Sequence, residues 1–241
     1  MFDPSKFDPA NPEGTEGQAQ KLFMKQDPKT GQNLAAGGYG IAVNPVDQTI
    51  WRAKPFSGGA ANEIMKLDPK TGVHTAYPLP PPGRGPRGID ATTDGKIWFA
   101  TGSGHLGRFD PTTEKFSYWE LPGPKLKNTG AETGSADMPY YIWVDQFDTF
   151  GMGKNMVITT GTNSDSMVVF DPPTEKFVVI RVPYPLSFFS RGLDGRIDDA
   201  NAGWKGRGLW ATYGEDPNMF VEKTQRSNAV HMQLRPDPLA H

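Results

Sequence analysis

The sequence predicts an all-β protein built from a repeated four-stranded antiparallel unit. The clearest copy spans residues 87–122, where short β-rich runs alternate with Asp-Gly, Gly-Ser-Gly and Asp-Pro-Thr-Thr segments. Such segments are typical of tight turns between consecutive strands. A single four-stranded sheet buries too little apolar surface to be stable alone, so the repetition of the unit is the main evidence for the fold.

An Asp-Pro turn marks each repeat at one place, between the third and fourth strands. It recurs at Asp27, Asp68, Asp110 and Asp171, at intervals of 41, 42 and 61 residues. Proline fixes φ of the second turn residue at about −65°, and the aspartate accepts hydrogen bonds from the turn backbone. These intervals predict β-propeller blades, with an insertion in the last interval.

Two further patterns recur in the same order. The first strand of each unit begins with small or apolar residues, as expected where blades crowd around the ring axis. The second strand is predicted at 50–53, 97–100, 156–159 and 209–212. Tryptophan occurs there in three of these units, which predicts that it packs between neighbouring blades.

The repeats predict a lead-in and one propeller domain. Residues 1–20 are polar and lack periodicity, so we expect an extended segment. Residues 21–241 form the propeller, with about four and a half blades: a partial blade at 21–35 and whole blades at 38–80, 87–122, 139–183 and 191–235. The last blade carries an insertion at 195–205, and we expect it to end in an outer strand at 229–234.

A propeller ring is usually closed by a blade whose strands come from both termini. Here the partial blade lacks its two inner strands, and the C-terminal segment does not supply them. The strand count therefore favours part of a larger ring of about seven blades. A compact ring of four to five blades is the alternative.

Composition excludes several classes of function. The net charge is −2, with 25 basic and 27 acidic residues interspersed, so no nucleic-acid partner is expected. The chain has no cysteine, which excludes disulfides, thiolate metal sites and a cysteine nucleophile. Its apolar runs are much shorter than the ~20 residues of a membrane helix, so no membrane insertion is expected. The N-terminus lacks the basic and apolar regions of a signal peptide.

The second whole blade resembles the virginiamycin B lyase (streptogramin lyase) family of β-propellers. The resemblance rests on Gly88-Ile89, on residues 94–99 and 106–112, and on Glu120-Leu121-Pro122, and it extends more weakly over about 21–234. It implies a periplasmic or secreted protein and, in the enzyme members, a ring of seven blades. In those enzymes a Mg²⁺ ion held partly by Glu, with a His as base, opens a cyclic depsipeptide by elimination.

The resemblance places the metal-binding Glu at the end of the second strand. The matching positions here are Lys54, Thr101, Thr160 and Tyr213. None of them is a carboxylate, whereas Mg²⁺ prefers carboxylate oxygens. No metal ligand is therefore assigned, and Mg²⁺ is implied by the resemblance alone; the residues themselves indicate no cofactor.

Histidines are the candidates for a general base. We expect His74 and His231, on outer strands, and the terminal His241 to be solvated. His105 precedes a third strand, close to the end of the second strand, and is a weak catalytic candidate. The favoured interpretation of His105 is a loop histidine without a catalytic role.

The remaining candidates lie on one face of the ring, where the loops after the second and fourth strands meet. Arg87 and Arg191 both stand one residue before the glycine that opens a blade, and an arginine binds carboxylate or phosphate through two parallel hydrogen bonds. The slightly favoured alternative is that each arginine ties a loop to the neighbouring blade. The ligand-binding candidates are Arg87, Arg191, Tyr140, Lys54, Thr101, Tyr213, Asp165 and Glu215.

The favoured function is a non-catalytic module that binds a small molecule or a protein partner at this face. One alternative is a metal-dependent carbon–oxygen lyase or a lactonase-type hydrolase, with its metal ligands in further blades of a longer chain. The other alternative is a structural or interaction scaffold.

Overall fold

The computed structural model describes residues 38–55, 62–123, 139–161, 166–181, 193–196, 208–213 and 228–232. The predictions for residues 1–20 and 21–35 lie outside these residues. Every described element is a β-strand, and no described helix is long and apolar enough to cross a membrane. The strands are β1 Ile41–Val43, β2 Ile50–Lys54, β3 Glu63–Leu67, β4 His74–Pro78, β5 Pro86–Ala91, β6 Ile97–Thr101, β7 His105–Asp110, β8 Lys115–Glu120, β9 Pro139–Asp145, β10 Met156–Gly161, β11 Ser166–Asp171, β12 Lys176–Arg181, β13 Leu193–Arg196, β14 Gly208–Tyr213 and β15 Asn228–Met232.

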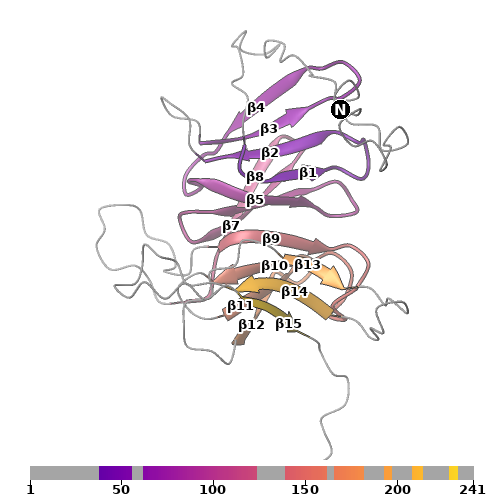
Figure 1. The fold of residues 1–241 in the computed structure, drawn as a ribbon. Coiled ribbons are helices and arrows are strands. Elements are labelled where there is room, and N and C mark those ends of the chain that lie inside the picture. Colours follow the sequence, from indigo (N-terminus) through magenta and orange to yellow (C-terminus); the bar gives the residue numbers. More distant parts are fainter. Residues whose placement is uncertain are drawn as a thin grey trace, which may run out of the picture.

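These strands form four antiparallel sheets that follow one another along the chain (Figure 1). We call them blade 1 (β1–β4), blade 2 (β5–β8), blade 3 (β9–β12) and blade 4 (β13–β15). In each blade the strands pair in chain order, so every sheet is a meander. This arrangement confirms the predicted all-β fold of four-stranded antiparallel units.

Blade 4 corrects one prediction. Its last described strand, β15, pairs directly with β14, with Trp210 opposite His231. It is therefore the third strand of the blade, and not the outer strand expected at 229–234. The insertion expected at 195–205 also starts later, because Gly195 and Arg196 belong to β13.

The Asp-Pro turns form as predicted in the described blades. The Asp68 carboxylate accepts hydrogen bonds from the Lys70 backbone N–H at 2.8 Å and from the Thr71 hydroxyl at 2.9 Å. Asp110 accepts one from the Thr112 N–H at 2.9 Å. Each carboxylate therefore stabilises the turn between a third and a fourth strand.

Tryptophans of the second strands pack between blades, which confirms the predicted role. The Trp51 ring lies 5.5 Å from the Phe109 ring of blade 2, and the Trp98 ring lies 5.6 Å from the Phe170 ring of blade 3. Each phenylalanine directly precedes an Asp-Pro turn. Because both tryptophans are fully buried, these layers form the apolar core that holds consecutive blades together.

Blade 3 has a register that differs by one residue from the predicted alignment. Ile142 pairs with Thr159, whereas the matching Ile41 pairs with Arg52 in blade 1. The equivalent of Lys54 and Thr101 is therefore Gly161 and not Thr160. Blade 3 has no tryptophan on its second strand, so the sequence offered no landmark for the alignment.

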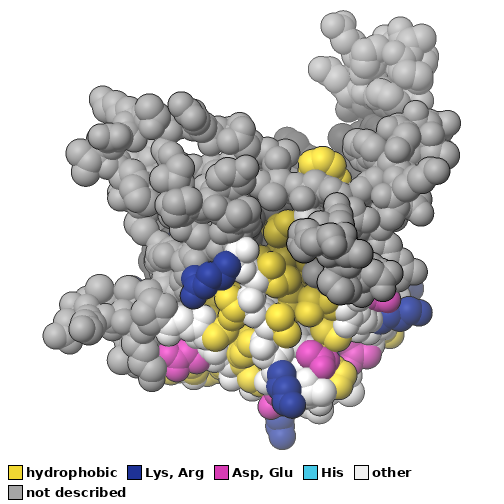
Figure 2. Space-filling view, turned by 90° about the horizontal axis from the view of Figure 1, so that it is seen from below, with side chains coloured by type: hydrophobic (Ala, Val, Ile, Leu, Met, Phe, Trp, Pro, Cys, Tyr) yellow, Lys and Arg dark blue, Asp and Glu magenta, His cyan; other side chains and the backbone are white. Residues whose placement is uncertain are grey.

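Apolar side chains also reach the surface at the end of the blade series formed by blades 3 and 4. Figure 2 views this end and shows hydrophobic side chains between basic and acidic ones. On the outer strand β12, Val178 and Val179 are both exposed. Scattered exposed apolar residues are normal on a protein surface.

Candidate binding site at the bulged ends of the inner strands

Two β-bulges lie at matching places on the inner strands of blades 2 and 3. In β5, residues 87–88 face a single residue of β6, Ala100. In β9, residues 140–141 face a single residue of β10, Thr160. A bulge bends its strand and redirects the side chains, and bulges are frequent beside functional sites.

Blade 1 begins with the same arrangement of two residues against one. The Tyr39 N–H donates to the Ala53 carbonyl at 2.7 Å, and the Ala53 N–H donates to the Gly40 carbonyl at 3.1 Å. Gly40 lies against the bulge of blade 2, because a Cβ atom added there would be 2.5 Å from the Arg87 carbonyl oxygen. Only glycine permits this close approach of two backbones.

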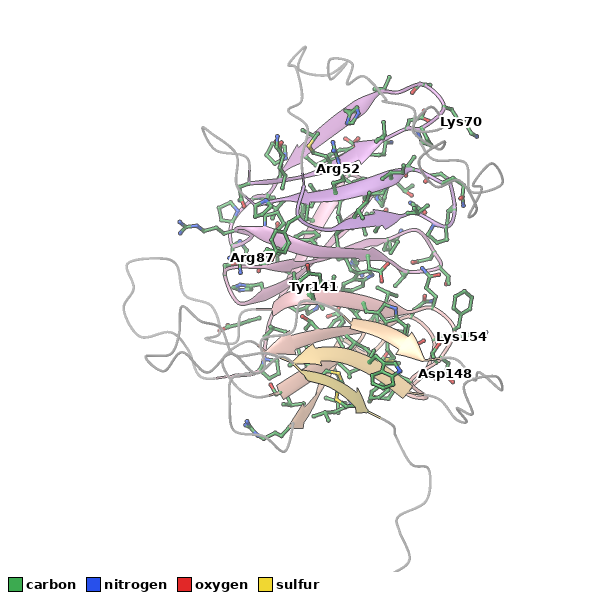
Figure 3. All side chains as sticks on the ribbon, in the orientation of Figure 1. Arg52, Lys70, Arg87, Tyr141, Asp148 and Lys154 are labelled. Carbon is green, nitrogen blue, oxygen red and sulfur yellow. The ribbon has the colours of Figure 1, made fainter. Side chains whose placement is uncertain are left out.

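Tyr39, Arg87 and Tyr141 come from these three matching places, and we call them the bulge cluster. Tyr39 belongs to blade 1 and Tyr141 to blade 3, yet their ring centroids are 6.0 Å apart, with the rings tilted by 54°. Arg87 comes from the blade between them, and all three residues are half-buried. In Figure 3, Arg87 and Tyr141 lie toward one edge of the blades, and Asp148 and Lys154 lie along the other edge.

Only one member of the bulge cluster was among the predicted candidates. Arg87 was predicted, and Tyr140 lies in the bulge of β9, but its side chain is outside the described part. Tyr39 could have been found, because it stands one residue before a blade-opening glycine, as Arg87 does. Tyr141 could not, because the alignment places it at the position of Gly88 and only the bulge directs it toward Tyr39.

Lys54 bonds within its own blade. The residue is buried, and its Nζ atom donates to Glu63 Oε1 at 3.0 Å. This ion pair joins the end of β2 to the start of β3. Burial of both partners makes each charge dependent on the other.

Thr101 has a similar role at the end of β6. Its hydroxyl is buried, donates to the His105 carbonyl at 2.6 Å and accepts from the His105 N–H at 3.0 Å. The Ser103 hydroxyl donates to the Thr101 hydroxyl oxygen at 3.1 Å. Thr101 therefore closes the turn between β6 and β7.

The two described histidine side chains differ from expectation. His105 is the first residue of β7 and not a loop residue; it is buried, and its Nδ1 atom lies 2.8 Å from the Ser103 carbonyl oxygen. His74 is also buried, although a solvated side chain was predicted. The predicted outer strand is correct for His74, but alternation along β4 turns this side chain into the face of blade 1.

The other predicted residues fall outside what the structure describes. Arg191, Asp165 and Glu215 lie outside the described ranges. Tyr213 and His231 lie in strands, but their side chains are not described. Their assignment to the channel face stays a prediction.

The donor set does not fit the Mg²⁺ ion that the family resemblance implies. Among the described residues, no three His, Cys, Asp or Glu side chains gather in one place. The Lys54 ammonium occupies one of the expected positions and would repel a cation. The register change replaces a second expected position, Thr160, with Gly161, which has no side-chain donor.

No family model matches the sequence, and no curated protein matches it. Among solved structures, the fold is similar to a catalytically inactive variant of virginiamycin B lyase from Staphylococcus aureus, crystallised with quinupristin. That match has a TM-score of 0.52 and 20% identity, and it covers 88% of this chain and 62% of the lyase. The chain thus spans less than two thirds of the length of that enzyme.

The fold is also similar to an auxiliary nutrient binding protein from Bacteroides thetaiotaomicron. The TM-score is 0.52 at 12% identity, over 75% of this chain and 44% of that protein. Identities this low establish the fold and not the activity. Together with the observed meander blades and the apolar layers between them, these similarities establish that the chain has the β-propeller fold.

Proposed function

We propose that this chain is a non-catalytic binding module that holds an anionic small molecule at the bulge cluster. The observation that carries the proposal is that Tyr39, Arg87 and Tyr141 come from matching places in three consecutive blades, with the two tyrosine rings 6.0 Å apart. A guanidinium group donates two parallel hydrogen bonds to a carboxylate or phosphate. Tyrosine rings add contact area and hydroxyl groups at little cost in conformational entropy. The expected ligand is therefore an anion attached to a flat or apolar group.

The backbone supports this assignment, because it fixes where the three side chains start. Each of them comes from a place where two residues share one partner on the next strand. Gly40 holds the first two of these places in contact. A site whose backbone is fixed in this way loses little entropy when a ligand binds.

The similarity to a nutrient-binding propeller agrees with a binding role, since that protein has the same fold and is named for binding. It does not identify the ligand. The charge of Arg87 favours an anionic ligand.

Calorimetric titration of the full chain with benzoate, phenyl phosphate and the neutral benzamide tests the proposal. We expect saturable binding of at least one anion and none of benzamide. Arg87→Gln should weaken binding at least tenfold, since a hydrogen bond to a charged group contributes about 1.5–3 kcal/mol. Arg181→Gln, at an exposed position on β12, is the matched control and should bind as the wild type does. Equal affinity in wild type and Arg87→Gln, or no binding of either anion, would contradict the proposal.

A second candidate is lyase activity, favoured by the fold similarity to virginiamycin B lyase. It requires metal ligands beyond the described residues, because Lys54, Thr101 and Gly161 provide no carboxylate. Incubation with quinupristin and MgCl₂, followed by mass spectrometry, separates the outcomes. Elimination opens the ring without a change in mass, hydrolysis adds one water, and a binding module leaves the ring closed. We expect the closed ring.

A further inference from the structure

The face of blade 1 that points away from blade 2, here called the outward face, is covered over one half only. On its inner strand, Ile41 and Val43 are 69% and 51% exposed. On its outer strands, Met65, Leu67 and His74 are all buried. The boundary between covered and uncovered side chains thus runs between the inner and outer strands of one sheet.

Equivalent side chains in the next two blades show what normally covers the inner strand. Ile89 of blade 2 and Ile142 of blade 3 match Ile41 in register, and they are 5% and 7% exposed. Val144 of blade 3, which matches Val43, is 2% exposed. These residues pack against the inner strands of the preceding blade. Among the described strands, none covers Ile41 and Val43 in this way.

The outward face of blade 1 has polar residues at two positions where blade 2 has aromatic ones. Arg52 and His74 stand where blade 2 has Phe99 and Phe116, both of which pack against blade 1. The Arg52 Nη2 atom lies 3.2 Å from His74 Nδ1. Because a guanidinium can only donate, His74 Nδ1 accepts and its Nε2 atom carries the hydrogen.

Two of these buried donors have no acceptor. Arg52 Nε and His74 Nε2 are buried without a hydrogen-bond partner. Unsatisfied buried donors are costly, and a buried positive charge requires an opposite charge nearby. A terminal repeat that faces water has a polar outer surface. The outward face has the reverse arrangement, with apolar side chains exposed and the polar pair buried.

We propose that the outward face is the docking surface for the two inner strands of a further propeller blade, which bring a carboxylate to the Val43 N–H as blade 2 brings Asp90 to Val144. The surface is continuous with the interfaces between blades 1 and 2 and between blades 2 and 3, and its exposed residues occupy the same register. The place of the carboxylate follows from the interface between blades 2 and 3, where Asp90 Oδ2 accepts from the N–H of Val144, the residue that matches Val43.

The chain contains a suitable probe in its own inner hairpin, residues 88–101. In blade 2 this hairpin directs Trp98 and Asp90 toward blade 3, where Asp90 Oδ2 accepts from the Val144 N–H at 2.7 Å. A synthetic peptide of this sequence therefore presents a tryptophan and a carboxylate on its docking side.

Fluorescence anisotropy of the labelled peptide, titrated with the full chain, tests the proposal. We expect saturable binding. The double variant Ile41→Lys, Val43→Lys should lose binding at least tenfold while keeping the far-UV circular dichroism of the wild type, because both positions are exposed. Asp90→Asn in the peptide should weaken binding several-fold, because in the register of blades 2 and 3 this carboxylate accepts from the Val43 N–H. Val178→Lys, an equally apolar exposed position on β12, is the matched control and should leave binding unchanged.

Three results would overturn the proposal. One is the absence of saturable binding to the wild-type chain. Another is equal binding to the wild type and to the Ile41→Lys, Val43→Lys variant. The third is self-association, measured by sedimentation, that this double variant abolishes and the peptide does not compete with; the occupant would then be a second copy of the chain.

Discussion

The two faces of blade 1 are made by alternate residues of the same strands but meet different surroundings. Toward blade 2, the Trp51 ring stacks on Tyr77 at 5.7 Å and contacts Phe109 at 5.5 Å, in a layer of aromatic rings. On the outward face, the next residue, Arg52, has His74 as its partner. The alternation of residues along the strand decides which face each side chain lies on. The type of side chain at each position depends on what covers that face.

Substitutions on the inner strands should give the largest difference in stability between the two faces. Ile89→Ala removes a buried side chain from the layer between blades 1 and 2 and should lower the free energy of unfolding by about 2–5 kcal/mol. Ile41→Ala changes the same residue type at the matching register position but removes an exposed side chain. Its effect should stay within about 0.5 kcal/mol. Urea unfolding followed by circular dichroism measures both.

The m-value of each variant serves as the control, since an unchanged m-value shows that the same surface unfolds. If both substitutions cost several kcal/mol, Ile41 is covered in solution, and the contrast between the two faces is wrong.

The sequence predicts the blades and their register only where a recurring residue, such as Asp-Pro or tryptophan, marks a position in the repeat. Repeated Asp-Pro turns and the tryptophans Trp51 and Trp98 are local signals, and the blades they predict are present. Blade 3 has Ile158 at the position of those tryptophans, and the alignment predicted for its second strand is wrong by one residue. Tyr141 could not be predicted as a member of the bulge cluster, because a bulge depends on how two strands pair, and no single strand specifies that pairing.

The burial of His74 was missed for a related reason. The predicted position of His74 on an outer strand is correct. A side chain on an outer strand of a propeller can nevertheless be buried, because one face of the strand lies against the neighbouring blade. In blade 2 the matching residue, Phe116, shows by its apolar character that this position is an interface.

The close contact between blades 1 and 2 should give the next largest effect. Gly40→Ala places a methyl group 2.5 Å from the Arg87 carbonyl oxygen, so one backbone must move. Overpacking of this kind costs about 1–3 kcal/mol. Because the movement displaces Arg87, the variant should also weaken binding of the anions tested above. Thermal unfolding and calorimetry measure the two consequences.

Gly102→Ala is the matched control for this substitution. Its added methyl group would meet the Arg84 and Gly85 carbonyl oxygens at 3.5 and 3.7 Å, which are ordinary van der Waals contacts. Equal stability of Gly40→Ala and the wild type would mean that the first two bulges are not in contact.

The smallest expected effect concerns the outward face and its pH dependence. Burial, and then the charge of Arg52, lower the pKa of His74 below its ordinary value of 6.5. The unfolded chain therefore binds a proton at a pH where the folded chain does not, and stability is lost as the pH falls below about 6.5. His74→Phe, which copies Phe116 of blade 2, should remove this loss. The carboxyl groups of Asp68 and Asp110, whose pKa values lie below 3.8, titrate at lower pH and are the same in both proteins. Melting temperatures between about pH 7.5 and pH 5.5 should thus fall more for the wild type than for His74→Phe, and parallel curves would show that His74 is solvated in the folded chain.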